Sequence, residues 1–446
     1  MSEKQQNKKV SIFWFRRDLR LEDNVGLNLA LDAGCSVLPV FIFDDEILRE
    51  LPADDARVTF IYETLFQMDL QLKKRGSSLR IYKGSPIEVW KEIVQLHDIE
   101  TVFANRDYEP YAISRDKSLE ELLIQKGIPF KTCKDQVIFE GNEVLKDDGK
   151  PYHVFTPYKN KWLRKFSESG FGSDEPAFRK GAVGHSPSQF VQETLDFPSM
   201  EALGFKEASI KVRPFDLSCA GAYEKNRDYP WIEGTSHLGP HLRFGTVSIR
   251  TIMSALDPAH EVFKSELIWR EFFMQILFHY PRVVNENFKK KYDGITWRNN
   301  EEEFDKWCRG ETGYALVDAG MRELNATGHM HNRVRMITAG FLCKHLLIDW
   351  RWGESYFAGK LLDYELSSNN GNWQWSAGTG CDAAPYFRIF NPMSQLKKFD
   401  KDQLYVRKWI PELESETYPE PIVDHKMART RALETYKTGM ERNDYF

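Results

Sequence analysis

Residues 10–43 read VSIFWFRRDLRLEDNVGLNLALDAGCSVLPVFIF and set the pattern of the first third of the chain. Two apolar runs, Val10–Phe15 and Val37–Phe43, predict buried strands, and the stretch Asn24–Ala33 between them predicts a helix. The alternation continues with strands predicted at 79–82, 101–104 and 130–133, and helices at 56–74, from Pro86 after the N-cap Ser85, and at 111–125. Strands that alternate with helices predict an α/β domain, a doubly wound parallel sheet covered on both faces.

The rest of the chain has a different character. From about residue 136 to 210 the periodicity weakens and Gly, Pro and Ser are frequent, as in Gly181–Ser188, which predicts a connector on the surface. Beyond it the pattern is helical, and nine of the 12 tryptophans lie after residue 230. We therefore expect an α/β domain at 8–135, a connector at 136–210 and an all-α domain at 211–446. No G-x-G-x-x-G follows a strand, so the sheet carries no dinucleotide fingerprint.

Composition and charge limit the cellular compartment and the kinds of site that the sequence predicts. No apolar run is long enough to span a bilayer, and the polar N-terminus MSEKQQNKKV lacks the apolar stretch of a secretory signal, so we expect a cytoplasmic protein away from membranes. The six cysteines form no C-x-x-C pair and no Cys/His cluster, which predicts neither a metal site nor a disulfide framework. The net charge is −5, yet Lys289–Lys291 and the segment 385–411 are basic. A solvated face explains such charge as well as a phosphate-binding surface does.

Six motifs carry a resemblance to a known family. They are WFRRDLRLEDN (Trp14–Asn24), EGTSHLGP (Glu233–Pro240), ELIWREF (Glu266–Phe272), TGHMHNRVRM (Thr327–Met336), LLDYELSSNNGNWQW (Leu361–Trp375) and DAAPYFRIFNP (Asp382–Pro392). In this order, from Ser11 to about Leu413, the chain resembles the cryptochrome/photolyase family, and within it the class I cyclobutane-dimer photolyases. The resemblance implies an N-terminal α/β domain and an all-α C-terminal domain that binds FAD.

A flavin site follows from the resemblance. The loop 234–239 is rich in small residues and hydroxyls that can donate to a pyrophosphate, although an ordinary helix-capping loop has the same composition. Glu365 stands where the family has a second Asp, and Asn369 matches the residue beside flavin N5. The residues that the resemblance assigns to FAD are Tyr223, Thr235, Ser236, His237, Leu238, Gly239, Phe263, Arg270, Asp363, Glu365 and Asn369.

The resemblance also implies a reaction, the light-driven splitting of cyclobutane pyrimidine dimers in DNA by a carbon–carbon lyase. The implied catalytic residues are Glu266, Trp269, Asn332, Met336 and Trp375; Arg333, Glu266, Trp269 and Asn332 are the implied DNA contacts. Glu266 is expected to hydrogen-bond the 5′ base of a flipped lesion and to stabilise its radical anion. Glu266, Trp269 and Arg270 have i, i+3, i+4 spacing, which places them on one helix face.

Trp297, Trp350 and Trp373 match the family's tryptophan chain, which carries electrons to an oxidised flavin. Taken without the resemblance, three tryptophans far apart in the sequence predict core residues. One departure from the family is His329, which stands where many class I members have Trp; a neutral core histidine is the expectation.

A second chromophore is a further implication, since many family members bind a folate, a deazaflavin or another flavin between the two domains. Ala112 occupies the position where folate-binding members place Glu, so we do not expect folate bound in that manner. The partner implied is DNA that contains pyrimidine dimers, bound by a monomer. The main alternative is a cryptochrome-type blue-light photoreceptor without repair activity; an electron-transfer flavoprotein and a non-catalytic DNA-binding module account for fewer of the motifs.

Overall fold

The computed structural model describes residues 9–169 and 184–443, and its contacts divide the chain into two compact units. Unit 1 comprises residues 1–140, 163–213 and 238–257, and unit 2 comprises residues 141–162, 214–237 and 258–446. Most of the polar N-terminus and the first residues of the Gly/Pro/Ser-rich stretch 181–188 lie outside the described residues.

Unit 1 contains a five-stranded parallel sheet with the strand order β3-β2-β1-β4-β5. The strands are β1 (Val10–Phe15), β2 (Ser36–Asp44), β3 (Arg80–Gly84), β4 (Ile99–Asn105) and β5 (Phe130–Cys133). The helices are α1 (Val25–Asp32), α2 (Asp45–Leu48), α3 (Ala56–Lys73), α4 (Pro86–Leu96), α5 (Pro110–Gln125), α8 (Gly239–Phe244) and α9 (Ile249–Ala255), with the 3₁₀ turn η3 (Pro187–Gln189). The predicted doubly wound sheet is confirmed.

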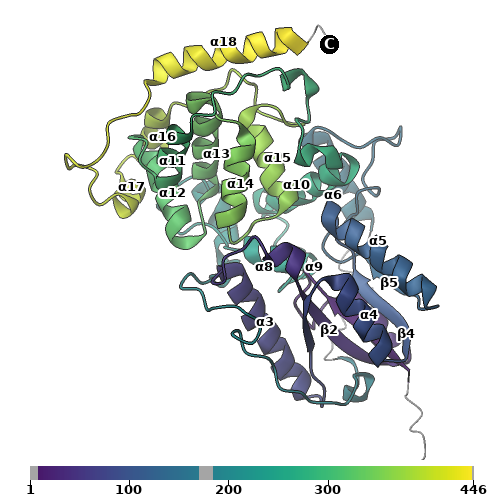
Figure 1. Ribbon diagram of the computed structural model, residues 1–446. Coiled ribbons are helices and arrows are strands. Elements are labelled where there is room, and N and C mark those ends of the chain that lie inside the picture. The colour runs from purple at the N-terminus through teal and green to yellow at the C-terminus, as the bar shows by residue number, and fades with distance from the viewer. Residues whose placement is uncertain (1–8, 170–183, 444–446) are drawn as a thin grey trace, which may run out of the picture. The chain divides into compact units, whose positions relative to one another are not determined.

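The alternation of side chains along β1 explains why both faces of the sheet are covered. Phe13 and Phe15 belong to one buried cluster, which includes α1 and α3 residues. Ile12 and Trp14 belong to another, which includes residues of α4 and α5. Figure 1 shows α3 on one side of the strands and α4 and α5 on the other. Strands buried on both faces read as continuous apolar runs, which is the pattern of VSIFWF.

Two helix starts show what fixes them locally. Residues 45–48 after β2 form the short helix α2, where the N-cap Asp44 side chain accepts a hydrogen bond from the Glu46 amide. Ser85 occupies the N-cap position of α4 but its side chain makes no capping hydrogen bond, so Pro86 at the first position fixes the start of that helix.

The segment predicted as a surface connector contains a helix, α6 (Phe155–Glu168), whose first part up to Trp162 belongs to unit 2. Phe155, Tyr158 and Trp162 are buried there, and the Trp162 indole donates to the buried Glu271 at 2.6 Å. The helix was missed because lysines and arginines fill its other face, so that the segment as a whole is as polar as a loop.

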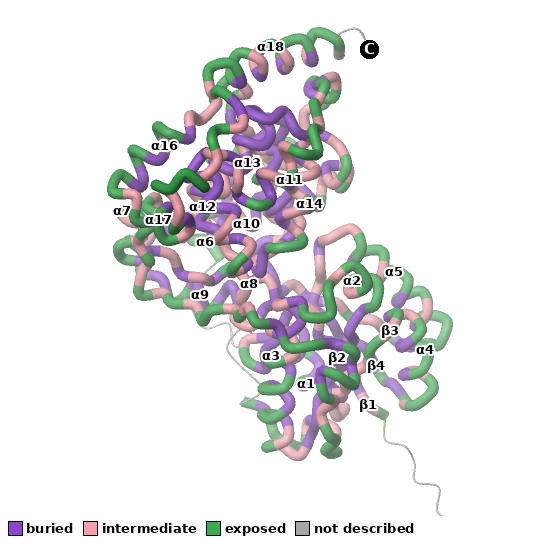
Figure 2. The backbone as a smooth tube through the Cα atoms, turned by 60° about the vertical axis from the view of Figure 1, so that its left-hand side comes forward, coloured by how far each residue is buried: buried purple, intermediate pink, exposed green. Residues whose placement is uncertain are grey.

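Unit 2 is helical, as expected (Figure 2). Its helices are α7 (Tyr223–Asn226), α10 (Glu261–His279), α11 (Glu301–Arg309), α12 (Ala315–Thr327), α13 (Asn332–Gly340), α14 (Trp350–Lys360), α15 (Leu366–Ala377), α16 (Pro392–Phe399), α17 (Leu404–Trp409) and α18 (His425–Asn443). Shorter turns are η4 (Ser218–Ala222), η5 (Pro281–Val284) and η6 (Lys290–Tyr292), and a π-helical segment, η7 (Phe341–Leu346), follows α13. Trp307, Trp350 and Trp373 lie in its main apolar cluster, which joins α11 to α15.

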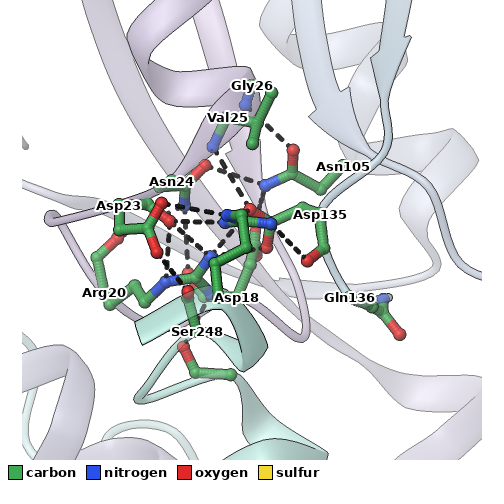
Figure 3. Close-up of polar contacts among 12 residues, drawn as sticks. Asp18, Arg20, Asp23, Asn24, Val25, Gly26, Asn105, Asp135, Gln136 and Ser248 are labelled. Carbon is green, nitrogen blue, oxygen red and sulfur yellow. Dashed lines mark hydrogen bonds and ion pairs between the residues drawn. The ribbon is translucent and has the colours of Figure 1, made fainter. Parts of the chain in front are cut away.

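The motif at residues 14–24 builds a buried polar network in unit 1 (Figure 3). The Arg20 guanidinium donates to both carboxylate oxygens of Asp135 at 2.7 Å, and Arg250 of α9 donates to one of them at 2.7 Å. Arg250 also donates to Asp23 at 3.0 Å. Burial would raise the pKa of Asp135, but Arg20 and Arg250 outweigh it and hold that pKa below its usual value.

The same network caps α1 at the carboxyl ends of β1 and β4. The Val25 amide donates to Asp135 at 3.2 Å and the Gly26 amide donates to Asn105 at 3.0 Å. Asn24, the N-cap residue of α1, accepts from the Leu27 amide and from the Asn105 side chain. Parallel α/β sheets often bind ligands at this edge, beside the strand where the order reverses. Here internal side chains fill it, so the motif serves the fold.

We expect Asp135→Asn to lower the free energy of unfolding by about 3–5 kcal/mol, because it leaves two buried guanidinium groups without their shared carboxylate. The free energy is measured by urea unfolding followed by circular dichroism. Glu88→Gln, which breaks an exposed ion pair with Lys91, is the control and should change it little. Equal effects in the two variants would contradict the structural role of the network.

Candidate functional site

The Gly/Thr/Ser loop lies between α7 and α8, as the sequence predicts. A Cβ on Gly234 would lie 2.9 Å from the Asn226 Cβ, so only glycine fits there. His237 has a φ of 51°, a left-handed conformation that costs a non-glycine residue energy and is typical of functional loops. The Ser236 carbonyl accepts from the Asp216 amide at 2.9 Å. Thr235 and Ser236 belong to unit 2, whereas Leu238 and Gly239 begin the chain's return to unit 1.

His329 faces this loop. Its ring lies 5.1 Å from the His237 ring, and its Nδ1 lies 3.5 Å from Glu323 Oε1. The His329 side chain is 34% exposed, so the expected core histidine is wrong. Glu323 also accepts from the Tyr405 hydroxyl at 2.6 Å. Burial would raise the pKa of Glu323, but its hydrogen bond with His329 contributes to holding that pKa below its usual value.

Helix α10 supplies one face of the site. Arg270 is paired with Glu365, with 3.2 Å between Nε and Oε2, and Glu266 is paired with Arg227. The buried Phe263 ring packs edge-on against Tyr223 at 5.0 Å. Phe263, Glu266 and Arg270 of one helix therefore contact α7, its C-cap Arg227 and the N-cap Glu365 of α15, and these contacts do not test the assigned roles.

Trp269 lies on the same helix, and its ring is stacked on Phe155 of α6 with 3.6 Å between centroids and 8° between planes. The Phe155 amide donates to Asp382 at 3.0 Å, which fixes the start of α6. One face of the Trp269 indole is thus covered by the protein. Phe155 was not among the sequence candidates, because it lies in the segment predicted as a connector.

The residues around the start of α15 are held by charges from neighbouring helices. Arg335 donates to both oxygens of Asp363 at 2.9 and 3.2 Å. Burial would raise the pKa of Asp363, but Arg335 outweighs it and lowers that pKa. Asn369 donates through Nδ2 to the carbonyl oxygen of Glu354 at 3.1 Å and to its carboxylate at 2.8 Å. Both bonds use Nδ2, which leaves Oδ1 as an acceptor.

Glu354 of α14 is a residue that sequence reasoning missed. Burial raises the pKa of its carboxyl group, and the hydrogen bond from Asn369 partly offsets that effect. No motif points to Glu354, since it is recognisable only from the packing of α14 against α15.

Helix α13 carries the other implied lesion contacts. Asn332 is exposed at its first position, and Met336 lies one turn later, half-buried. Arg333 is paired with Asp228 and its guanidinium lies 4.5 Å from the Phe399 ring. Its Nη1 lies 3.9 Å from the sulfur of Met336. A phosphate would therefore find the Arg333 cation already oriented, with its charge partly compensated.

The three tryptophans of the implied electron chain differ in burial. Trp373 and Trp350 are 2% and 0% exposed, and Trp297 is partly buried. Trp373 packs against α14 at Gly353, where a Cβ would lie 2.1 Å from the indole. Trp350 begins α14, and its indole donates to Asn287 at 2.9 Å. Trp375 is half-buried, two residues after Trp373 on α15.

The donor set around these residues fits the parts of FAD. Hydroxyls and backbone amides of Thr235–His237 suit a diphosphate, and the Arg270 cation suits an electron-rich ring. The free acceptor of Asn369 suits the N–H group of a reduced flavin. Among the described residues no cluster of His, Cys, Asp or Glu could hold a metal ion, and no helix is long and apolar enough to cross a membrane.

Several basic residues of the segments 289–291 and 385–411 are paired with acids or partly buried. Lys290 pairs with Glu286 at 2.5 Å and Arg407 pairs with Glu414. Burial lowers the pKa of Lys289, with Lys291 adding to the effect. Lys397, Lys398 and Lys401 are exposed.

Comparisons with known proteins agree with this geometry. Residues 11–178 match a family model described as DNA photolyase, and residues 263–416 match one described as the FAD binding domain of DNA photolyase. The deoxyribodipyrimidine photo-lyase of Halobacterium salinarum is 36% identical, over 96% of this chain and 99% of the relative.

Two solved structures are similar over nearly the whole chain. A bacterial class III photolyase from Agrobacterium tumefaciens has a TM-score of 0.84 and 33% identity, with 99% of this chain and 100% of that chain covered. An archaeal photolyase from Sulfolobus tokodaii with two FAD molecules has a TM-score of 0.80 and 34% identity, covering 96% and 99%.

The approach of α10 and α15 can be tested at Gly371, between Asn369 and Trp373. A Cβ there would lie 2.1 Å from the Phe273 ring, so Gly371→Ala should separate the two helices and lower stability by about 1–3 kcal/mol. Thermal unfolding measures the stability, and flavin absorbance per chain measures the bound cofactor, which should also fall. Gly359→Ala on α14 is the control, because nothing lies within 4 Å of its Cβ. Full flavin content in Gly371→Ala would contradict a site at this contact.

Proposed function

Because the chain belongs to the DNA photolyase family, we propose that it splits cyclobutane pyrimidine dimers in damaged DNA with light, using FAD held in unit 2. The observation that carries the proposal is the shared face of α10. On it, Arg270 is tied to Glu365, Glu266 is held by Arg227, and Trp269 is backed by Phe155.

FAD, when bound and fully reduced, supplies an excited state that can give one electron to the lesion and take it back after the two ring bonds break. The chain has to bind, orient and dehydrate the two bases. The FAD contacts are assigned to the residues named from the sequence, of which Tyr223, Phe263, Arg270 and Glu365 are joined by contacts within unit 2.

The lesion is assigned to Glu266, Trp269, Asn332, Met336 and Trp375. Phe155 covers one face of the Trp269 indole and Phe273 lies 5.4 Å from the same ring, so a flipped base is proposed to stack on the part of this half-buried indole that the two rings leave exposed. Glu266, fixed by Arg227, can accept a hydrogen bond from the N3–H of a pyrimidine. Arg333 is assigned to a backbone phosphate, which sets affinity more than lesion choice.

The oligomeric state, the cellular compartment and the domain boundaries are also proposals. Every side chain assigned to the lesion lies in unit 2 of one chain, which supports a monomer. All six cysteines are free thiols, which suits the reducing cytoplasm. We keep the functional boundaries at 8–135 for the α/β domain and 211–446 for the FAD and repair domain, with 136–210 between them.

A second chromophore of unknown identity is part of the proposal. Ala112 is buried on α5, and its methyl group cannot form the hydrogen bonds of a Glu. The folate mode of the family is therefore not expected, while the relative with two FAD molecules gives a precedent for a flavin.

Glu266→Ala should lower repair per absorbed photon by about 2- to 10-fold, because a typical net hydrogen bond is about 0.5–1.5 kcal/mol. The measurement is recovery of pyrimidines in a dimer-containing oligonucleotide, with anaerobic, chemically reduced protein under blue light. Wild-type protein that binds FAD but repairs nothing in this assay would favour the cryptochrome-type photoreceptor instead.

Trp373→Phe should block the light-driven reduction of oxidised flavin and spare repair by chemically reduced protein. Phenylalanine is much harder to oxidise than tryptophan, and it lacks the outer indole atoms Cη2 and Cζ3 that lie against Gly353. Trp307→Phe is the control. The Trp307 ring is buried in the same cluster, 6.1 Å from the Trp373 ring, so this variant shows how a loss of packing alone affects repair. Equal loss of both activities in Trp373→Phe would show that Trp373 is a packing residue.

A further inference from the structure

The segment 227–231 runs outward from the proposed lesion site. Its first two residues are bound to that site, since Arg227 pairs with Glu266 and Asp228 pairs with Arg333. The following residues, Tyr229 and Trp231, are therefore at its margin in unit 2. Neither carries a role in the proposed chemistry.

Tyr229 and Trp231 are exposed aromatic side chains in a fixed turn. They are 36% and 46% exposed, and their ring centroids lie 6.2 Å apart. The Tyr229 amide donates to the Asn226 carbonyl and the Ile232 amide donates to the Tyr229 carbonyl, at 3.0 and 3.1 Å. Pro230 between them restricts the backbone further. The two rings are thus held in place before any ligand arrives, which lowers the entropic cost of binding.

Two cations lie over the aromatic ring that Tyr229 contacts. Tyr229 packs at 6.4 Å on Phe399 of α16, and the Phe399 ring also carries the Arg333 guanidinium at 4.5 Å and the Lys398 ammonium at 5.0 Å. Lys397 is exposed on the same turn as Lys398, while exposed acids nearby in the sequence are Glu224, Glu233 and Asp402. Figure 2 shows exposed residues along α7, α16 and α17.

Exposed aromatic rings interleaved with cations match the chemistry of single-stranded nucleic acid, whose bases stack and whose phosphates are negative. An apolar protein partner would gain nothing from desolvating the lysines. We propose that Tyr229 and Trp231 form a stacking platform for an unpaired base next to the lesion, with Lys397 and Lys398 on the adjoining phosphates. This inference rests on the proposed function, because it takes DNA as the substrate.

The test measures dissociation constants by fluorescence anisotropy in the dark. The probes are a labelled oligothymidylate of about 15 nucleotides, long enough for one single-strand site, with one cyclobutane dimer and the same strand without it. Trp231→Ala should weaken binding of both strands alike, by roughly 5-fold or more, because a stacking platform accepts any base. Trp231→Phe should retain most of the affinity. Phe66→Ala, an exposed aromatic of α3 in unit 1, is the matched control and should bind as wild type does.

Salt titration separates stacking from charge. Lys398→Gln should reduce the slope of log K against log salt by about 0.7, the amount expected for one phosphate contact on a single strand, whereas Trp231→Ala should keep the slope. Flavin absorbance and circular dichroism show that each variant is folded. Unchanged affinity of folded Trp231→Ala and Tyr229→Ala for both strands would overturn the platform. A loss confined to the dimer strand would also overturn it, since it would place Trp231 in the lesion site.

The two proposals fail in distinguishable ways. If the wild-type protein repairs dimers and Trp231→Ala binds DNA as tightly as wild type does, only the platform is contradicted. If Trp231→Ala weakens DNA binding as predicted but the wild-type protein repairs no dimers under light, the proposed function is contradicted.

Discussion

Four arginine–carboxylate pairs join the segments that carry the site. Arg227 and Arg270 bind the acids Glu266 and Glu365, and Arg333 and Arg335 bind Asp228 and Asp363. Each pair links residues that are far apart in the sequence, so together they hold α7, α10, α13 and the start of α15 in one arrangement. Such pairs add little net stability when partly exposed, but their geometry is directional. Precise placement of the side chains is what electron transfer and base recognition require.

Unit 1 uses the same chemistry for a different purpose. Asp135 accepts from Arg20 and Arg250 and caps α1, so a carboxylate with two cations stands where many α/β folds place a ligand. The N-terminal family motif is therefore explained by folding, whereas the motifs of α10, α13 and α15 gather around the proposed site. A shared sequence signature does not by itself tell which of these two roles its residues have.

Local pattern predicted much of the structure. Periodicity and capping residues predicted the strands VSIFWF and VLPVFIF, the helix that starts at Pro86 and the helical second half of the chain. The i, i+3, i+4 spacing predicted which side chains of α10 share a face, but it did not predict the residues that they contact. Phe155, Arg227 and Glu354 could not be found in this way, because each acts through a tertiary contact and lies outside the family motifs. His329 lies inside a family motif, but its exposure was misjudged because only packing reveals that it faces His237 and Glu323.

The stack of Phe155 on Trp269 has a consequence for dissecting the protein. The FAD-binding model matches residues 263–416, and a helical domain cut at residue 211 would include that whole match. It would nevertheless lack residues 141–162, which belong to unit 2 although they precede residues 163–213 of unit 1 in the sequence. Such a fragment would remove Phe155 from the face of the Trp269 indole and leave Glu271 without the Trp162 indole. Chimeras between relatives should therefore exchange residues 141–162 together with the C-terminal half.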